Sequence, residues 1–447
     1  MKKFLYIFFG LLLFITFFTS YKVISGNYDK QNLFIIKVKD IIPTQLKNKF
    51  RGYIYEIRIA FTQDKIKKKQ QAKLKQGLNG ELVQSKNIKS EVNKVEYNVR
   101  EFFLPFKRLD LSYGWQAIQN SKRAHYFDFV GDKTIVASGE GNFIFFDTKN
   151  FNSKKLDQKI LQSNLIQFIE SENYTFIGLR DMLIDDNKLY LSVVLQDSDE
   201  NYTLSIISAE FNYQKLIFEF FFKTELLISK FSIGTGGRIV SFKDDKLLFT
   251  IGHLGFIDEI QMQNHLSGKI ISINKKDGSF DLISKGHRNH QGLFYYTDEF
   301  ENHFVINSEH GPKGGDEINI NNLKDNKVQN FGWPISSYGI NYDGTNPYKS
   351  SHKEYGFKEP LKYFTPSIGI SEISIKTKKD FNEIYASSLR AHSIYIVKSD
   401  KIFSRVLNTD RLILDYRIRD IKYSKSLNGF IVIFENTPSI GFIKSYD

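Results

Sequence analysis

The residues best suited to chemistry lie between positions 286 and 333, where cationic, amide, acidic and glycine residues follow one another at close spacing. The segment GHRNHQGL carries Arg288, Asn289 and Gln291. The segment SEHGPKGGDEIN places a turn rich in glycine and proline after the strand-like HFVINS. Such a turn exposes backbone carbonyl oxygens and lets the chain approach a neighbouring group closely. Carbonyl oxygens on a rigid turn suit a hard cation such as calcium.

A third motif, NFGWP, follows these two. The order and separations of the three motifs resemble those of the glucose/sorbosone dehydrogenases, which use pyrroloquinoline quinone (PQQ), and the resemblance runs from about Arg180 to about Glu435. It implies a six-bladed β-propeller that oxidises an aldose sugar or related polyol with PQQ and calcium, by hydride transfer to the quinone. The resemblance leaves the electron acceptor open.

The resemblance also implies roles for individual residues. Arg288 and Asn289 match residues that contact the cofactor, and Gly311 and Pro312 match residues whose backbone carbonyls hold the cofactor's calcium. A flat ligand with three carboxylates requires several cationic groups and a cation near its quinone oxygen.

A further set of cofactor contacts is implied after position 360. Arg417 and Arg419, in YRIRDI, match a pair of arginines that clamp the cofactor carboxylates, and alternate residues of a strand face the same side. The alternative is two exposed strand arginines. Ser367 keeps the hydroxyl that the family often has near the cofactor. Arg390 replaces a lysine of the family, so a planar guanidinium replaces a compact ammonium group.

The catalytic base of the family is absent from its expected position. The family has a histidine four residues before an arginine, and this chain has Gly234 before Arg238. The family's supporting aspartate corresponds to His253. Two interpretations follow: either His253 has become the base, since a histidine suits proton transfer near neutral pH, or the cofactor site persists without sugar oxidation. A histidine bonded to a blade carbonyl is the structural alternative for His253.

The elements that must position these residues recur along the chain. From about Val99 onward, an acidic or Asn-rich turn followed by an apolar strand occurs six times, mostly at intervals of roughly 50 to 60 residues, which is typical of propeller blades. The six units begin near positions 131, 185, 243, 301, 381 and 427. We therefore expect an all-β, six-bladed propeller, with a pair of β-sandwiches as the less favoured architecture.

Composition narrows the classes of function. The 447 residues are 41% hydrophobic, enough for a large core, and contain no cysteine, which excludes disulfides. The net charge is +12, but no nucleic-acid-reading motif is present, so nucleic acid is not an expected partner. A ligand-binding, non-catalytic propeller outside the cytoplasm is the alternative function.

The N-terminus predicts export. Lys2 and Lys3 precede an apolar stretch over residues 4–18, and no clear cleavage site follows it. We interpret residues 1–25 as a transmembrane signal anchor, with secretion after signal cleavage as the alternative. The positive-inside rule then places the propeller on the extracytoplasmic (periplasmic) side of the cell membrane.

Two polar segments complete the predicted organisation. Residues 26–98 contain a Lys/Gln-rich run and are expected to form a basic, partly helical juxtamembrane linker before a propeller over residues 99–447. The lysines of that run either touch anionic headgroups or form a solvated helix face. Residues 341–356 are a turn-rich insertion that is either a wall of the substrate site or a tolerated surface loop.

Overall fold

The computed structural model describes residues 80–106, 122, 124–229, 234–243, 245–325, 327–435 and 437–445. The chain divides into two compact units, residues 1–68 and 69–447, and every described residue belongs to the second. The predicted anchor and most of the predicted linker lie outside the described residues. Within the described ranges, no helix has both the length and the apolar character needed to cross a bilayer.

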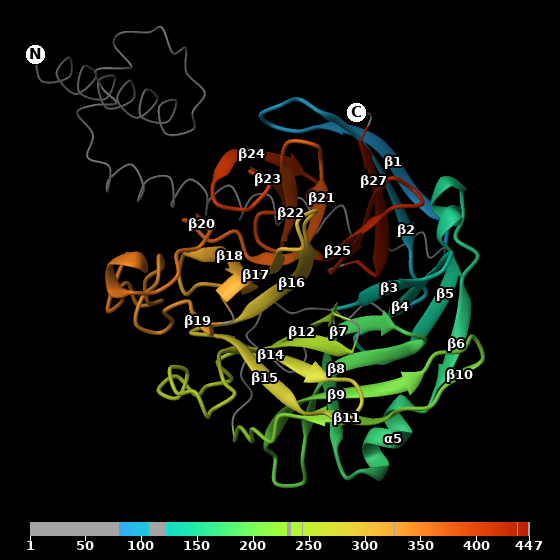
Figure 1. Cartoon of the computed structure of the whole chain (residues 1–447). Helices are drawn as coiled ribbons and strands as arrows, with labels where there is room; N and C mark the ends of the chain where they lie inside the picture. Colours follow the sequence, from blue (N-terminus) through green and yellow to red (C-terminus); the bar gives the residue numbers. More distant parts are fainter. Residues whose placement is uncertain are drawn as a thin grey trace, which may run out of the picture. The chain divides into compact units, whose positions relative to one another are not determined.

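Six sheets form the blades of a propeller (Figure 1). The first has the order β3 (Tyr126–Val130), β4 (Lys133–Ala137), β5 (Phe143–Asp147), β6 (Lys159–Ser163) and β10 (Lys215–Leu216). The second has the order β7 (Thr175–Asp185), β8 (Lys188–Gln196), β9 (Tyr202–Glu210) and β11 (Glu219–Lys223). The third has the order β12 (Gly236–Phe242), β13 (Lys246–Ile251), β14 (Lys269–Asn274), β15 (Phe280–Lys285) and β19 (Gln329–Asn330).

The other three sheets complete the ring. The fourth has the order β16 (His290–Thr297), β17 (His303–Glu309), β18 (Asp316–Asn322) and β20 (Lys362–Phe364). The fifth has the order β21 (Ile370–Thr377), β22 (Asn382–Ser388), β23 (Ser393–Ser399) and β24 (Val406–Ile413). The sixth has the order β25 (Ile418–Ser424), β26 (Gly429–Phe434), β27 (Ser439–Ser445), β2 (Glu96–Phe103) and β1 (Leu82–Lys89). Short helices α5 (Leu165–Ser171), η1 (Thr148–Asn152), η2 (Leu323–Asp325) and η3 (Lys353–Tyr355) lie in the connections.

The sixth sheet joins strands from both ends of the propeller. β2 pairs antiparallel with β27, with Tyr97 opposite Ser445 and Phe103 opposite Ser439. The predicted boundary at position 99 is therefore wrong, because it falls inside β2 and assigns β1 to the linker. The polar alternation of LVQSKNIK in β1 is that of an outer strand with one solvated face, which a reading for apolar strands overlooks.

The six predicted repeats are the second strands of the six blades, β4, β8, β13, β17, β22 and β26. This confirms the prediction of an all-β, six-bladed propeller. The turns before these strands explain the polar residues of the repeat. Gly131, Asn187 and Asn428 have φ values of 58°, 60° and 48°, in the left-handed region that glycine and asparagine favour in tight hairpins.

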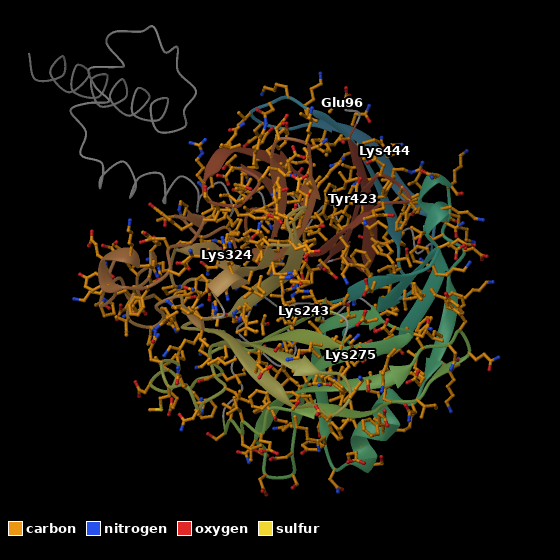
Figure 2. The ribbon with its side chains drawn as sticks, viewed as in Figure 1. Glu96, Lys243, Lys275, Lys324, Tyr423 and Lys444 are labelled. Carbon is orange, nitrogen blue, oxygen red and sulfur yellow. The ribbon has the colours of Figure 1, made fainter. Side chains whose placement is uncertain are left out.

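The hydrophobic core lies between neighbouring blades. One cluster joins Ile135 and Phe143 of the first blade to Leu179 and Leu191 of the second, and the next joins Ile206 of the second blade to residues of the third. Polar contacts support the same interfaces at the rim. Figure 2 labels Lys275. Its ammonium group lies 2.8 Å from Asp185 and 2.6 Å from Asp186 of the neighbouring blade. Each blade is thus held by the two beside it.

Buried carboxylates connect the innermost strands. Asp128 of β3 accepts the backbone N–H of Ile184 on β7 at 2.8 Å, and Asp181 of β7 accepts that of Ile239 on β12 at 2.9 Å. Two more pairs follow the same pattern, Glu372 with the N–H of Leu293 at 3.0 Å and Asp420 with that of Phe127 at 3.4 Å. Polar side chains therefore replace sheet hydrogen bonds where one blade meets the next.

Arg238 of β12 neutralises this acidic group. Its Nη1 lies 2.9 Å from Glu372, 3.2 Å from Asp181 and 3.9 Å from Asp420, and its side chain is only 3% exposed. Burial raises the pKa of Glu372 to about 8 and that of Asp420 to about 6, although Arg238 opposes both shifts. Three blades therefore share one buried cation.

We predict that Arg238→Met destabilises the propeller by about 3–5 kcal/mol at pH 8, because it leaves buried carboxylates without their cation. The loss should be smaller at pH 5. A carboxyl whose pKa is higher in the folded than in the unfolded state stays protonated in the folded chain at low pH. As the pH rises between the two pKa values, the carboxyl must ionise inside the protein, and the cost of that ionisation then lowers the stability. Urea unfolding at both pH values checks this, with Arg405→Met, at a side chain 77% exposed, as the control. An equal, small loss in both variants would contradict a central role for Arg238.

Candidate active site

Arg417 and Arg419 converge on one buried carboxylate. The Nη2 atoms of Arg417 and Arg419 lie 3.3 Å and 3.0 Å from Oε2 of Glu435, whose side chain is fully buried. The backbone N–H of Glu435 donates to the carbonyl of Arg417 at 2.9 Å, so the pairing of β25 with β26 fixes the contact. The two arginines thus lie on one face, as their spacing predicts, and their charges are partly balanced within the protein.

A chain of amides connects this pair to the GHRNHQGL segment. Nη1 of Arg419 donates to Gln291 at 2.9 Å, and the Gln291 amide donates to the Asn289 oxygen at 3.0 Å. That oxygen also accepts the backbone N–H of Gly236 at 3.4 Å. Asn289 is therefore held beside the start of β12, in the same network as the arginine pair.

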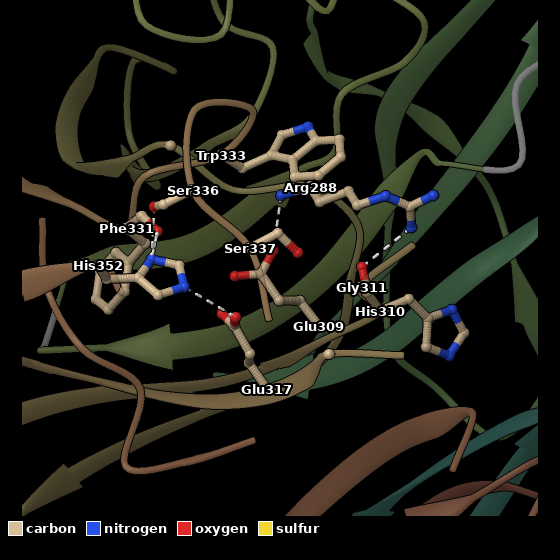
Figure 3. A pocket seen from close by; sticks show the side chains of 12 residues that line it. Arg288, Glu309, His310, Gly311, Glu317, Phe331, Trp333, Ser336, Ser337 and His352 are labelled. Carbon is tan, nitrogen blue, oxygen red and sulfur yellow. Dashed lines mark hydrogen bonds and ion pairs between the residues drawn. The ribbon is translucent and has the colours of Figure 1, made fainter. Parts of the chain in front are cut away.

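Arg288 lies at the base of the glycine-rich turn. Its backbone N–H donates to Glu309 at 2.6 Å, and its Nη1 donates to the carbonyl of His310 at 3.0 Å (Figure 3). Its guanidinium carbon lies 5.4 Å from the centre of the Trp333 ring. Two of the motifs that suggested the site are joined here, and the third, NFGWP, provides the aromatic wall.

Asp316 joins the glycine-rich turn to the Ser367 loop. Its carboxylate accepts the Gly311 N–H at 3.2 Å, the Ser367 hydroxyl, and the N–H groups of Ile368 and Ile370, each at 3.0 Å. A side chain on Gly311 is excluded, because an ideal Cβ there would lie 2.2 Å from the carbonyl oxygen of Gly315. The turn is therefore held from both sides, which fixes the carbonyls that follow it.

Arg390 reaches the same region through its backbone. Its N–H donates to the carbonyl of Ile368, the residue after Ser367, at 3.0 Å. The adjacent carbonyl of Leu389 accepts Nη1 of Arg417 at 3.2 Å. The structure thus brings the predicted residues Arg288, Asn289, Gly311, Ser367, Arg390, Arg417 and Arg419 into one connected network, while their roles stay predictions.

Hydrogen-bond donors without a partner indicate which class of ligand this network would bind. In the described part of the chain, the buried Nε atoms of Arg288, Arg417 and Arg419 have no hydrogen-bond partner. Arg180 is a fourth guanidinium beside the network. Burial and, after it, the positive charge of Arg419 lower the pKa of Arg180 to about 10. A flat polyanion would satisfy such donors and relieve the repulsion between like charges. PQQ fits this donor set.

The described residues contain no group of three or more His, Cys, Asp or Glu side chains arranged to hold a metal. A calcium ion would therefore depend on the backbone carbonyls of Gly311 and Pro312 and on oxygens of its ligand. Carbonyl oxygens suit calcium chemically. The rigid, glycine-restricted turn is compatible with that use.

His253 occupies the space above Gly234. An ideal Cβ on Gly234 would lie 2.0 Å from Nε2 of His253, so no side chain fits at position 234 beside this imidazole. The Gly255 N–H donates to Nδ1 of His253 at 3.0 Å. The neutral ring therefore carries its proton on Nε2, which donates and does not accept. This tautomer is the wrong one for the predicted base, because Nε2 has no lone pair available.

Two acid–histidine pairs lie near Arg288. Nδ1 of His287 is 3.1 Å from Glu309. Nε2 of His352 is 3.3 Å from Glu317 (Figure 3). The cavity lined by Glu309, Glu317, His352, Arg288 and Trp333 has a volume of about 10 Å³. That volume suits one water molecule and excludes an organic ligand. This side of Arg288 is therefore structural support for the site.

His352 also ties the insertion to the site. Its Nδ1 lies 2.9 Å from the Phe331 carbonyl and 2.9 Å from the Ser336 hydroxyl. Burial favours the neutral ring, but Glu317 and Glu359 together hold the pKa of His352 above its usual value. Tyr348, from the same insertion, packs on Trp333 with ring centres 5.0 Å apart. Residues 341–356 thus form part of the aromatic wall beside Arg288.

We predict a pH-dependent contribution of His352 to stability. Because its folded pKa is raised, the contribution is complete below the unfolded value of about 6.5 and is lost as pH rises through the folded pKa. The difference in unfolding free energy between the native chain and His352→Asn should shrink from pH 6 to pH 9. His265→Asn is the control, since burial lowers the pKa of His265 and reverses the trend. A difference that grows with pH for His352→Asn would refute the prediction.

The sequence analysis missed Glu435, Asp316 and Arg180 as site residues. Arg180 donates to the Thr235 hydroxyl at 2.8 Å, which places it beside Gly234. Asp316 had a local signal, because it follows the GPKGG turn directly. Glu435 and Arg180 had none, since only the pairing of strands and the meeting of blades brings them to the arginine pair.

The family model of the glucose/sorbosone dehydrogenases matches residues 176–441. The chain therefore belongs to the glucose/sorbosone dehydrogenase family.

Curated relatives are similar over part of their length. Protein slr1608 of Synechocystis sp. is 28% identical over 233 residues, which are 46% of this chain and 54% of the relative. The aldose sugar dehydrogenase YliI of Escherichia coli is 28% identical over 231 residues, which are 47% of this chain and 59% of the relative. The chain thus spans little more than half the length of these relatives.

Solved structures share the fold. The apo form of the soluble aldose sugar dehydrogenase of Escherichia coli has a TM-score of 0.56 at 20% identity, covering 73% of this chain and 96% of that chain. The PQQ-bound aldose sugar dehydrogenase of Streptomyces coelicolor has a TM-score of 0.53 at 18% identity, covering 78% of this chain and 98% of that chain. At these identities the likeness supports the six-bladed propeller alone.

Proposed function

We propose that this protein is a PQQ-dependent dehydrogenase that oxidises an aldose sugar or a related polyol. One observation carries the proposal: the unpartnered Nε donors of Arg288, Arg417 and Arg419 belong to one hydrogen-bonded network with Asn289. Several guanidinium groups held in one place recognise a ligand with several carboxylates. Membership of the family and the aldose sugar dehydrogenase activity named for a relative support the substrate class.

The chain's own residues would bind and orient the reactants. Arg288, Arg417 and Arg419 would hold the cofactor carboxylates, while Asn289 and Ser367 would offer polar contacts and Arg390 a further charge. When bound, PQQ would supply the acceptor for the hydride. Trp333 and Tyr348 would exclude water from one side of the site.

Calcium is the second part of the proposal. The carbonyls of Gly311 and Pro312 would hold the ion, and Asp316 would fix the turn through the Gly311 N–H. A cation at this turn would add positive charge beside Arg288 and polarise an oxygen of the ligand.

We expect chelation of calcium to weaken PQQ binding at least tenfold, because one of the charges that neutralise the ligand is removed. Calorimetric titration of the purified protein with PQQ, with and without EGTA, measures this. Calcium added back should restore the affinity, and magnesium should not, since it prefers a smaller octahedral site. An affinity that EGTA leaves unchanged would remove calcium from the proposal.

We also propose an extracytoplasmic location for the propeller, anchored by the apolar segment over residues 4–18. The two lysines before that segment and its nearly unbroken apolar composition support this proposal. The electron acceptor is left open.

A non-catalytic, ligand-binding propeller is the second candidate. It is favoured by the glycine at position 234 and by the Nε2–H tautomer of His253, which leave the predicted base position without a proton acceptor. Protein loaded with PQQ and calcium, supplied with a panel of aldoses and an artificial electron acceptor, distinguishes the two. Bleaching of the acceptor supports the dehydrogenase. PQQ binding without turnover supports the second candidate, and absence of PQQ binding contradicts the proposed function.

We predict that Arg419→Ala weakens PQQ binding about 10- to 100-fold, because a hydrogen bond between charged groups contributes about 1.5–3 kcal/mol. The melting temperature should fall by only a few degrees, since Arg417 still neutralises Glu435. Calorimetry and thermal unfolding of the two proteins check this. Arg405→Ala, at an exposed position, should leave both quantities unchanged. Intact PQQ affinity in Arg419→Ala would place the ligand elsewhere.

A further inference from the structure

The environment of His253 is built to hold one ring orientation. The backbone N–H of His253 donates to the Arg288 carbonyl at 2.8 Å, and the N–H of Leu254 donates to the Gly234 carbonyl at 3.0 Å. Leu254 is fully buried and has a φ of 54°, a left-handed conformation that leucine rarely adopts. Such backbone strain persists where the surroundings over-determine it and is concentrated at functional sites.

The Nε2 end of the ring lies over Gly234, at the start of a segment that contacts two residues of the network. Nε2 lies where a side chain of residue 234 would begin, above a segment whose Thr235 binds Arg180 and whose Gly236 binds Asn289. Nδ1 faces away and accepts the Gly255 N–H. The ring thus has a single N–H donor, on the nitrogen that lies over Gly234.

We propose that His253 is a hydrogen-bond donor that holds the oxygen at the oxidised carbon of the sugar, through Nε2–H. This deepens the proposed function and rests on it. The donor stabilises the negative charge that develops on that oxygen as its proton leaves, in the manner of an oxyanion-binding group. The proton leaves to a water molecule, because Nε2 of His253 has no lone pair with which to accept it.

The electrostatic surroundings fit a donor. Burial and, after it, the positive charge of Arg288 lower the pKa of His253 to about 4. The ring stays neutral between pH 6 and pH 9 and keeps its Nε2 proton throughout. Donation by His253 therefore requires no change of protonation in the working range.

Substitution separates a donor from a base. Glutamine places an N–H group close to the position of Nε2 but accepts no proton, whereas alanine removes both capacities. For the protein loaded with PQQ and calcium, we expect His253→Ala to lower kcat/KM about 100-fold, as loss of one oxyanion donor does. His253→Gln should stay within about tenfold of the native value. A His253→Gln variant as slow as His253→Ala would overturn the proposal.

The tautomer is measurable without turnover. Nitrogen-15 spectra of the cofactor-free full chain, labelled at its nine histidines, distinguish Nε2–H from Nδ1–H rings, and the spectrum of His253→Gln identifies the signal of His253. We expect an Nε2–H ring from pH 6 to pH 9. An Nδ1–H ring would overturn the proposal even if PQQ binding and sugar oxidation are normal. Failure of the native protein to bind PQQ would instead contradict the proposed function and leave the tautomer result standing.

A double-mutant cycle of unfolding free energies tests the packing that orients the ring. Gly234→Ala should be strongly destabilising in the native background, because its Cβ would meet Nε2 at 2.0 Å, and nearly neutral in the His253→Ala background. Urea unfolding of the four proteins gives the coupling. Equal losses in both backgrounds would show that the ring lies elsewhere and would overturn the placement of its donor.

Discussion

Neutralisation of buried charge at the centre of the ring is the constraint on which the rest of the structure depends. Arg238 contacts carboxylates from three blades, and its Nη2 also donates to the carbonyl of Arg419 at 3.3 Å. The same side chain therefore holds the blades in place and fixes the backbone of a residue in the proposed cofactor site. Carboxylates that accept backbone N–H groups across blade interfaces leave little freedom for one blade to shift without the others. This network makes the site rigid. Recognition of a planar, highly charged ligand requires that the groups that bind it are held in fixed positions.

The site carries more positive charge than it balances internally. Glu435 offsets part of the charge of Arg417 and Arg419, while Arg180 and Arg288 lie in the same network. Burial and, to a smaller extent, the positive charge of Arg419 lower the pKa of Arg180. Glu435 has a second effect, because it orients the two guanidinium groups before any ligand arrives. An anion that enters this site gains attraction and relieves repulsion among the arginines, so its binding should stabilise the folded chain. Orientation by an internal carboxylate and an excess of cations together explain how a site can be ordered and still favour a polyanion.

The sequence predicted the features that depend on local chemistry. Turns such as that at Gly131 need a residue with a left-handed backbone conformation before the second strand of a blade, so the blade repeat can be recognised from short segments of sequence. The GPKGG turn is equally local, since a side chain at Gly311 would collide with Gly315. The pairing of β2 with β27 joins residues more than 300 positions apart, and β1 is too polar to stand out, so the boundary of the propeller was placed too late. Glu435 was missed for the same reason, because its meeting with Arg417 depends on strand pairing and not on a motif.

The pair formed by Gly234 and His253 shows why the type of residue at a site does not settle its role. A histidine near a proposed substrate site suggests a base, but the role depends on which ring nitrogen is free, and that depends on the backbone beside it. Here the Gly255 N–H occupies Nδ1, while the absence of a side chain at Gly234 gives Nε2 its space. The two positions are therefore coupled by volume, because a larger residue at 234 would displace the ring and lose the contact that sets its tautomer. A change that removes a side chain at one position thus creates a defined hydrogen-bond donor at another, and the pair has to be read as one unit.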